Sequence, residues 1–362
     1  MKKIAIIGTN GIPSNYGGFE TLVEYLAKFL SDTYRITVFC SLKSRNDKPR
    51  YYRGCKLVYI NLNANNWQSI PYDVISLFKS YKKFDKILIL GASGGIAMPY
   101  FSKYQDKFIL NFGGLDWQRS KWNYFTRKFI KISEYFSIKY SKHLISDNKG
   151  IQNYIESEYG RKSNLATYGG DQSFKLVPAA KDFERNSFLK NDYAFTVARI
   201  QSDNNIELIL NAFDNKGAFP IVFVGNWNNS DFGIKIKNRY SGRKNLILLE
   251  AIYDPRELNL LRSNCKIYIH GHSAGGTNPA LLEAMNVQLP IFTYDCNFNR
   301  YTTEEKARYF LDSDELSELL HKTNSDELKI ISDDMLEISN RRYTWQKIAN
   351  EYAKVIDESL VC

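Results

Sequence analysis

The sequence predicts an α/β protein with two domains, each built around a parallel sheet. Short β-branched or aromatic runs alternate with longer amphipathic segments along the 362 residues, which is the pattern of strands joined by crossover helices. The runs IAIIG and KILILG are apolar throughout, as expected of strands that helices cover on both faces. The length also suits two domains better than one.

The predicted strands divide into two groups. The first group comprises Lys3–Gly8, Ile36–Cys40, Lys56–Asn61, Lys86–Leu90, Phe108–Phe112, His143–Ser146 and Asn164–Tyr168. The second group comprises Ala194–Ala198, Ile221–Gly225, Asn245–Leu249, Lys266–His270 and Pro290–Tyr294.

The alternation stops at the polar segment Asp171–Asn191, which we interpret as the linker. We therefore predict a Rossmann-like first domain over residues 1–175 and a Rossmann-like second domain over 176–342. In residues 343–362 the apolar side chains recur at helical spacing, at Trp345, Ile348, Tyr352, Val355 and Ile356. This segment is predicted to be a helix that crosses back to the first domain.

Composition excludes several classes of protein. Hydrophobic residues make up 44% and charged residues 24% of the chain, as in soluble globular proteins. No apolar run approaches the about 18 residues that a membrane span needs, and the first run is too short for a signal peptide, so we predict a cytoplasmic protein. Five cysteines without a CxxC pair indicate reduced thiols and neither disulfides nor a zinc site.

The charge is uneven. Residues 1–180 hold 27 Lys and Arg against 13 Asp and Glu, whereas residues 181–362 hold 22 against 26. A basic first half attracts phosphate, nucleic acid or an anionic membrane surface. No nucleic-acid-binding module is recognisable, so nucleic acid is the least favoured of these partners.

A glycine-rich loop, Gly8–Glu20, follows the first predicted strand and precedes the helical segment TLVEYLAKFL. Backbone amides at such a helix start suit anions, which makes Gly17 and Gly18 candidate donor-binding residues. The spacing is not the GxGxxG of dinucleotide-binding proteins. The alternative is a tight turn without a ligand.

A second loop runs from His270 into the helical segment ALLEAM. Asn278 suits a helix N-cap and Pro279 the first helical position. The amides of Gly276, Thr277 and Asn278 would then face outward, where a diphosphate fits.

Glu283 lies inside this apolar helical segment. A carboxylate there is costly unless it is hydrogen-bonded. Hydroxyls of a sugar or ribose would satisfy it, and the alternative partners are a backbone amide or a buried arginine.

The segment HGHSAGGTNPALLEAM resembles the donor-site signature of retaining glycosyltransferase family 4. The resemblance implies the B-type fold, with two Rossmann-like domains facing a cleft, and retention at the anomeric carbon. In that family two Glu residues, with seven residues between them, bracket the loop. The second Glu matches Glu283, but the first falls on Gly275.

Together with GIPSNYGGFETLVEYL and YDCNFNRYTTEEKARYF, the segment resembles a narrower bacterial branch of rhamnosyltransferases in capsule and O-antigen assembly. This resemblance implies dTDP-rhamnose as donor and a lipid-linked saccharide as acceptor. The protein would then lie at the inner face of the cell membrane.

The resemblance extends to two further positions. In the family an Arg at a strand end, with a Lys five residues on, neutralises the donor diphosphate. Arg199 matches the Arg, but Asn204 stands at the position of the Lys. Asp116 falls in a region that faces the reacting sugar, so it is a candidate hydroxyl contact, or equally a helix N-cap.

Two patterns that suggest a metal are better explained otherwise. Asp312 and Asp314 mimic the DxD of metal-dependent transferases, yet they precede a helical segment and suit a capping role. His270 and His272 share one face of an extended segment but lack a third ligand in register. We predict no metal and no cofactor, and one of these histidines as a donor contact.

The segment Lys121–Tyr140 carries an apolar stripe at Phe125, Phe129, Ile132 and Phe136. We expect this stripe to face the protein core. The basic residues beside it would rest on anionic lipid if the protein binds a membrane.

The sequence therefore predicts a metal-independent, retaining glycosyltransferase in which Arg199, Glu283 and Asp116 serve the reaction. Two alternatives stay open. A nucleotide-sugar epimerase shares this fold, and the departures at Gly275 and Asn204 are also expected of a sugar-nucleotide-binding subunit without catalysis.

Overall fold

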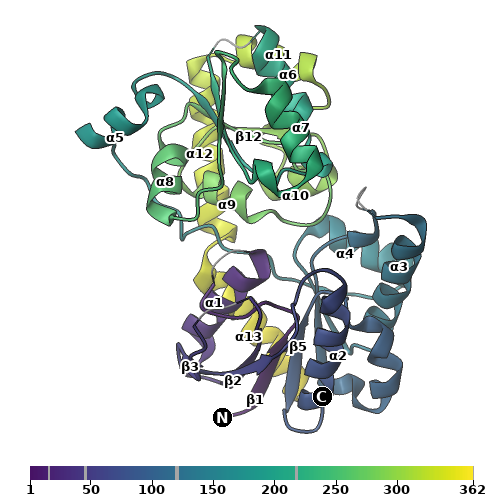
Figure 1. Ribbon diagram of the computed structural model, residues 1–362. Coiled ribbons are helices and arrows are strands. Elements are labelled where there is room, and N and C mark those ends of the chain that lie inside the picture. The colour runs from purple at the N-terminus through teal and green to yellow at the C-terminus, as the bar shows by residue number, and fades with distance from the viewer. Residues whose placement is uncertain (15–16, 45–46, 119–121, 217–218, 362) are drawn as a thin grey trace. The chain divides into compact units, whose positions relative to one another are not determined.

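The computed structural model describes residues 1–14, 17–44, 47–118, 122–216 and 219–361. The chain forms two compact units (Figure 1). Unit 1 comprises Met1–Tyr168 and Trp345–Cys362, and unit 2 comprises Gly169–Thr344. Unit 2 thus begins seven residues before the predicted boundary at 175/176. The physical reason is local: the backbone N–H of Gly170 donates to the carbonyl of Tyr343, at 2.8 Å, within unit 2.

Unit 1 contains an eight-stranded sheet in the order β3-β4-β2-β1-β5-β6-β7-β8. All neighbours are parallel except β3 and β4. The strands are β1 (Lys3–Ile7), β2 (Arg35–Ser41), β3 (Tyr51–Tyr52), β4 (Cys55–Ile60), β5 (Lys86–Leu90), β6 (Phe108–Phe112), β7 (His143–Ser146) and β8 (Asn164–Leu165). The short edge strand β3 is an addition to the predicted set.

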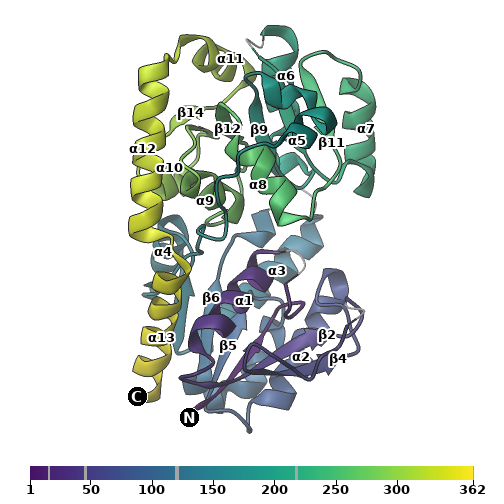
Figure 2. The ribbon, with the colours of Figure 1, turned by 90° about the vertical axis from the view of Figure 1, so that its left-hand side faces the viewer.

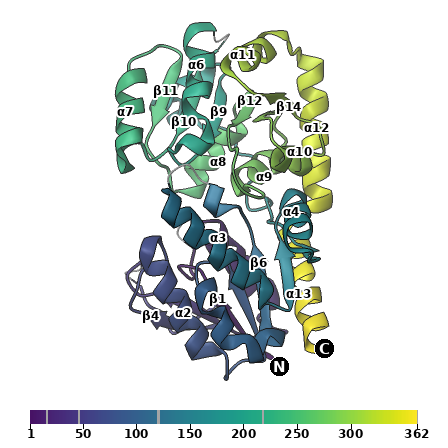
Figure 3. The same ribbon diagram turned by 90° about the vertical axis from the view of Figure 1, so that its right-hand side faces the viewer.

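The helices of unit 1 cover both faces of this sheet. They are α1 (Gly18–Leu30), α2 (Ser69–Ser80), α3 (Tyr124–Lys139), α4 (Lys149–Tyr159) and α13 (Trp345–Val361), with 3-10 segments η1 (Asn66–Gln68), η2 (Gly95–Lys107) and η3 (Asp116–Gln118). Figure 2 shows α1 and α13 on one face, and Figure 3 shows α2 and α3 on the other.

The terminal helix α13 is an integral part of unit 1. The rings of Tyr25 and Trp345 stack with centroids 4.4 Å apart, and the hydroxyl of Tyr34 donates to Asp357 at 2.6 Å. Tyr352 reaches the end of β6, where its hydroxyl accepts from the amide of Asn111. The last segment of the chain therefore completes the core of the unit formed by the first 168 residues.

Unit 2 contains a six-stranded parallel sheet in the order β11-β10-β9-β12-β13-β14. The strands are β9 (Ala194–Val197), β10 (Ile221–Val224), β11 (Leu246–Leu249), β12 (Ile267–His270), β13 (Ile291–Tyr294) and β14 (Arg308–Phe310). Two sheets of parallel strands confirm the predicted α/β fold class.

The helices of unit 2 are α5 (Ala180–Arg185), α6 (Ile206–Lys216), α7 (Asp231–Tyr240), α8 (Pro255–Ser263), α9 (Pro279–Asn286), α10 (Asn297–Thr303), α11 (Ser313–Lys322) and α12 (Ser325–Arg342), with η4 (Ser187–Lys190), η5 (Ser202–Asn204) and η6 (Trp227–Asn229). Helix α5 lies inside the segment that we interpreted as linker. At α11 the carboxylate of Asp312 accepts from the N–H groups of Asp314 and Glu315, each at 2.9 Å, which confirms the predicted capping role. Among the described helices, none is both long and apolar enough to span a bilayer.

Helix α3 contradicts in part the expectation that its apolar stripe faces the core. Phe125 and Ile132 are exposed, whereas Phe129 and Phe136 are half-buried. The buried residues of the helix are Ser133, Glu134, Ser137 and Ile138. The reason is a close approach to η2, because a Cβ at Gly95 would lie 1.9 Å from the carbonyl oxygen of Ser133 and 2.2 Å from Oγ of Ser137. Only small side chains fit between backbones this close, so the aromatic side of the helix turns outward.

Candidate functional site

The carboxyl ends of β9 and β12 lie at a switch point of the unit 2 sheet. From β9 the chain proceeds to β10 and β11 on one side, whereas β12, β13 and β14 lie on the other. In open parallel sheets such a reversal leaves a crevice at the carboxyl ends of the two central strands, and ligands bind there. The loops that follow these two strands contain most of the predicted donor-binding residues.

Asn204 joins the two loops. Its Nδ2 donates to the carbonyl of Arg199, at 2.7 Å, and its Oδ1 lies 2.8 Å from Nδ1 of His272. Because the Oδ1 of an amide can only accept, Nδ1 of His272 is the donor. Asn204 is 8% exposed, so the residue that stands in place of a Lys serves to fasten the loops.

Further bonds connect the same loops. The backbone N–H and the hydroxyl of Ser273 both donate to the carbonyl of Asp203, at 3.0 and 2.9 Å. The amide of Asn205 donates to the carbonyl of Gly271, at 2.9 Å. The loop that carries Arg199, an exposed residue two positions after β9, is thus held against the loop that leads into α9.

The helix α9 begins where the sequence predicts. The side chain of Asn278 accepts from the N–H of Ala280, at 3.0 Å, and Pro279 is the first helical residue, which confirms the N-cap. Gly275 has φ +106°, a conformation that glycine adopts without strain. The residues Gly275, Gly276 and Thr277 are buried within the loop, beside the positive end of the helix dipole.

Glu283 is held by two side chains of unit 2. Its Oε2 lies 2.5 Å from Nη2 of Arg262, and its Oε1 accepts from Nε2 of Gln172, at 2.7 Å. The side chain of Arg262 is 2% exposed and that of Glu283 is 21% exposed. The buried arginine that we left open as an alternative is therefore present, and the carboxylate does not depend on a ligand for its hydrogen bonds.

Neither Arg262 nor Gln172 was predicted from the sequence. Arg262 follows two leucines on the buried side of α8, where a cation needs a partner. That pattern was the available signal. Nothing in the sequence near Gln172 indicates its contact with Glu283, which is 111 residues away.

His270 lies inside the unit at the end of β12. It is 4% exposed, and its Nε2 has no hydrogen-bond partner among the described residues. Burial, together with a smaller effect of His272, lowers the pKa of His270 to about 3, so its imidazole is neutral at physiological pH. Of the two predicted histidines, only His272 is partly exposed.

In unit 1 the glycine-rich loop is organised by Glu20. The carboxylate of Glu20 accepts from the hydroxyl of Thr9 at 3.0 Å, from the N–H of Asn10 at 2.8 Å and from its amide at 3.1 Å. Gly17 has φ +126°, and a Cβ there would lie 1.9 Å from Oε2 of Glu20. The close approach of the Glu20 carboxylate is therefore enough to require a glycine at position 17, without an anionic ligand. This agrees with the alternative stated above, a tight turn that binds no ligand. Gly18 is the first residue of α1.

Asp116 is exposed and begins η3, in the connection that follows β6. The next residue, Trp117, forms a cation–π contact with Lys131, whose Nζ lies 4.9 Å from the ring centroid. The same Nζ lies 3.2 Å from the buried carboxylate of Glu134. Asp116 therefore stays a candidate by its place at the carboxyl edge of the unit 1 sheet.

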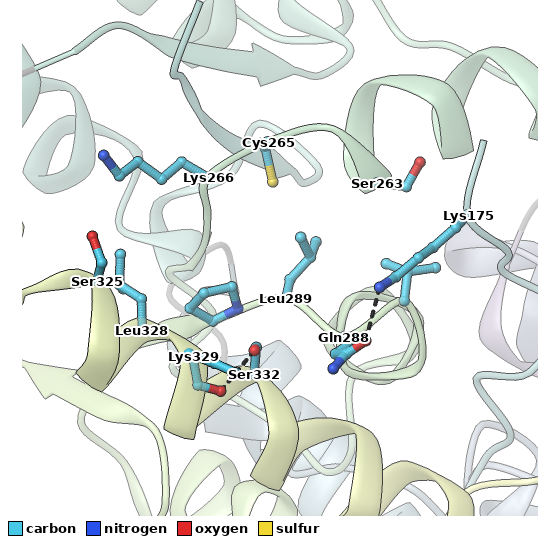
Figure 4. A pocket seen from close by; sticks show the side chains of 12 residues that line it. Lys175, Ser263, Cys265, Lys266, Gln288, Leu289, Ser325, Leu328, Lys329 and Ser332 are labelled. Carbon is cyan, nitrogen blue, oxygen red and sulfur yellow. Dashed lines mark hydrogen bonds between the residues drawn. The ribbon is translucent and has the colours of Figure 1, made fainter. Parts of the chain in front are cut away.

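A depression of about 380 Å³ lies elsewhere in unit 2 (Figure 4). Its lining includes Lys266 and Pro290, directly before β12 and β13, so it opens at the amino edge of the sheet. Two of its lysines already have partners: Lys175 donates to Gln288 at 2.8 Å, and Lys266 lies 2.6 Å from Asp192. The candidate site is at the opposite edge.

Two family models match the chain, one in each half, and their limits lie close to those of the two units. Residues 1–171 match a family model described as a domain of unknown function (DUF1972). Residues 179–343 match the family model described as glycosyl transferases group 1. A search of curated proteins gave no significant match.

Several solved structures resemble the whole chain. They include the sucrose-phosphate synthase of Thermosynechococcus elongatus, with a TM-score of 0.80, 14% identity and 100% of both chains covered. Anabaena HepE, in complex with UDP and glucose, has a TM-score of 0.73 and 13% identity, with 99% of this chain and 100% of that chain covered. A glycosyltransferase of Rickettsia africae has a TM-score of 0.71 and 13% identity, with 99% and 98% covered.

At these identities the structural likeness shows the fold. Together with the family match of residues 179–343, it supports a glycosyltransferase with the GT-B fold, which consists of two Rossmann-like domains.

Proposed function

We propose that the chain transfers a sugar from a nucleotide-diphosphate donor that binds at the carboxyl edge of the unit 2 sheet. One observation carries the proposal. The strand end with Arg199 and the loop into α9 are fastened together at the switch point through Asn204 and His272. These loops bring the chain at Arg199 close to the start of α9, and a guanidinium and a helix N-terminus on adjoining loops would together suit a diphosphate.

In this proposal the bond between the anomeric carbon and the diphosphate oxygen breaks, and the leaving diphosphate takes its electron pair. The oxygen of an acceptor hydroxyl forms the new bond to the anomeric carbon, and the proton of that hydroxyl passes to the leaving diphosphate. Arg199 and the amides of Gly276, Thr277 and Asn278 stabilise the charge on the leaving group. This assignment requires no metal or cofactor. The resemblance to retaining enzymes favours attack from the face that the diphosphate leaves.

Glu283 is proposed to orient the donor through its hydroxyl groups. Arg262 and Gln172 fix the carboxylate with one bond to each oxygen, and the remaining lone pairs can accept hydrogen bonds from a sugar or ribose. Asp116, on unit 1, is proposed to contact an acceptor or donor hydroxyl.

The identity of the donor sugar and of the acceptor is proposed from the resemblance to bacterial rhamnosyltransferases. We propose dTDP-rhamnose as the donor, a lipid-linked saccharide as the acceptor and surface polysaccharide as the product. The protein would then work at the cytoplasmic face of the membrane, where such a lipid is accessible.

Nucleotide binding gives the first test. Calorimetry of dTDP, UDP, GDP and ADP against the chain should find one diphosphate that binds, and Arg199→Gln should weaken it at least tenfold, because a charged hydrogen bond is worth about 1.5–3 kcal/mol. The matched control is Arg256→Gln, at another exposed arginine of unit 2, which should leave the affinity unchanged. Equal affinity for the Arg199 variant and the wild type would remove the proposed diphosphate site.

Turnover gives the second test. The chain is incubated with dTDP-rhamnose, with and without a lipid-linked saccharide extract, and products are followed by mass spectrometry. Transfer that requires the acceptor supports the proposal. Conversion of the donor sugar without an acceptor would identify an epimerase. Tight donor binding with neither transfer nor hydrolysis would identify a binding subunit.

A further inference from the structure

The outward side of α3 is unusually apolar for a surface helix. Tyr124 is 63% exposed, Phe125 80%, Ile132 47% and Tyr135 43%, and Figure 3 shows α3 running along the outside of unit 1. The inward side consists mainly of small or polar residues. Since these four side chains point toward solvent, packing within unit 1 does not account for them.

The apolar surface continues onto neighbouring elements on the same face of the sheet. Ile75 and Phe78 of α2 and Ile96 and Tyr100 of η2 are exposed. The rings of Phe78 and Tyr100 lie in contact, with centroids 5.2 Å apart, and η2 packs directly against α3 through Gly95. We name these residues, with the four of α3, the aromatic face of unit 1.

Cations are interspersed with these rings. Nζ of Lys128 lies 4.6 Å from the ring centroid of Tyr124, and Nζ of Lys139 lies 5.3 Å from that of Tyr135. Residues 123–142 contain five basic residues and one acidic residue, Glu134. Glu134 is buried and bound to the hydroxyls of two tyrosines, so the outward side of α3 presents positive charge.

We propose that the aromatic face of unit 1 docks on an anionic phospholipid bilayer. Aromatic side chains that alternate with lysines along one side of a helix are suited to the headgroup region, where rings enter the boundary and ammonium groups meet phosphate. Charge complementarity favours anionic lipid as the occupant. The inference deepens the proposed function and rests on it in one respect, because a lipid-linked acceptor would bring the enzyme to this surface.

The experiment is flotation of the full chain with vesicles of phosphatidylcholine alone or of phosphatidylcholine with phosphatidylglycerol. We expect binding only to the anionic vesicles, and its loss as salt is raised, because salt screens the attraction. The double variant Phe125→Asn/Ile132→Asn should reduce the fraction bound at least tenfold. Lys128→Gln/Lys139→Gln should reduce it about fivefold for each charge removed.

The matched control is Ile330→Asn on α12 of unit 2, where the isoleucine is 62% exposed, and this variant should float like the wild type. All variants should keep the wild-type unfolding temperature and nucleotide-diphosphate affinity, which separates a failure of docking from a failure of the proposed function. Wild-type flotation of the Phe125/Ile132 variant, or no flotation of the wild type, would overturn the proposal. A concentration-dependent dimer that the same variant abolishes would assign the face to a second copy instead.

Discussion

The guanidinium of Arg262 and the carboxylate of Glu283 lie 2.5 Å apart, and only the carboxylate has access to solvent. The two charges therefore differ in what can stabilise them when the partner is removed. If Arg262 is removed, Glu283 can still be hydrated and bound by Gln172. If the charge of Glu283 is removed, Arg262 remains as a buried cation with Asn259 as its other partner.

This asymmetry predicts that Glu283→Gln destabilises unit 2 more than Arg262→Met does. Removing one partner of a buried ion pair leaves the other charge buried without compensation and lowers the free energy of unfolding by about 3–5 kcal/mol. Arg262→Met should cost less, because the remaining charge of Glu283 is partly exposed. Chemical denaturation measures both values. The reverse order would mean that Arg262 is not a buried cation in solution.

The role of Glu283 in the reaction needs a variant without a stranded cation. Arg262→Met/Glu283→Gln removes both charges, so its stability should be close to that of Arg262→Met. Its kcat should nevertheless fall at least tenfold below that of Arg262→Met, because the carboxylate that orients the donor is missing. Equal kcat values in the two variants would remove Glu283 from the mechanism.

Asn204→Ala should weaken binding of the nucleotide diphosphate. The substitution breaks the bonds to the Arg199 carbonyl and to His272, and a buried polar group left without a partner costs about 1–3 kcal/mol. We expect roughly a fivefold to hundredfold loss of affinity by calorimetry. Asn228→Ala, at an exposed asparagine that contacts Glu250, is the matched control. An unchanged affinity in Asn204→Ala would show that the loop connection does not shape the site.

His270 should make the protein less stable in acid. Its pKa is about 3 in the folded state, against an ordinary value of 6.5 for histidine, so the unfolded chain binds the proton first and stability is lost as pH falls below 6.5. Between pH 7 and 5 the loss from this residue is about 2 kcal/mol. His270→Phe should lose correspondingly less stability over this range in denaturant titrations. The same pH dependence in both proteins would mean that the folded protein binds a proton at His270 as readily as the unfolded chain does.

Asp73 should act in the opposite direction. Burial raises its pKa from 3.8 to about 8, so the folded state keeps a proton that the unfolded state releases, and stability falls as pH rises from about 4 to 8. Asp73→Asn keeps the side chain neutral. Its free energy of unfolding relative to the wild type should therefore rise by about 3 kcal/mol between pH 5 and 7. A constant difference would indicate that Asp73 is ionised in the native protein.

Gly95→Ala should destabilise unit 1, because the new methyl group would meet the Ser133 carbonyl at 1.9 Å. Overpacking of this kind costs about 1–3 kcal/mol, measurable by urea denaturation. Gly95→Ala/Ser137→Ala removes one of the two contacting groups, the Ser137 hydroxyl, and should recover part of the loss. Full stability of Gly95→Ala would contradict the close packing of α3 on η2.

Local patterns predicted most of the strands and several helix ends. The run Lys86–Leu90 forms β5 and the run Phe108–Phe112 forms β6 with the predicted bounds, because continuous apolar runs have few alternatives to a buried strand. Asn278 caps its helix as predicted, since the cap depends on residues one or two positions away. The edge strands β3 and β14 were not predicted, because they are short and carry little apolar signal.

The candidate site was predicted less completely. The sequence indicated the loop into α9 and the position of Arg199, but the role of Asn204 follows from a contact with His272, 68 residues away. Two residues of the stripe on α3, Phe125 and Ile132, are exposed and do not face the core. Periodicity shows that a helix has two faces and not which of them meets the sheet. The side of α3 that packs inward depends on the close contact between Gly95 and Ser133, which the periodicity of apolar residues does not reveal.

By itself the sequence determined two parallel-sheet units and the loops that end at their carboxyl edges, since short-range propensity and periodicity encode strands, helices and caps. The tertiary structure decided that Arg262 pairs with Glu283, that Asn204 fastens the two loops and that α3 turns its rings outward. Each of these depends on contacts between segments far apart in the chain, whose free energies exist only once the backbone has brought them together.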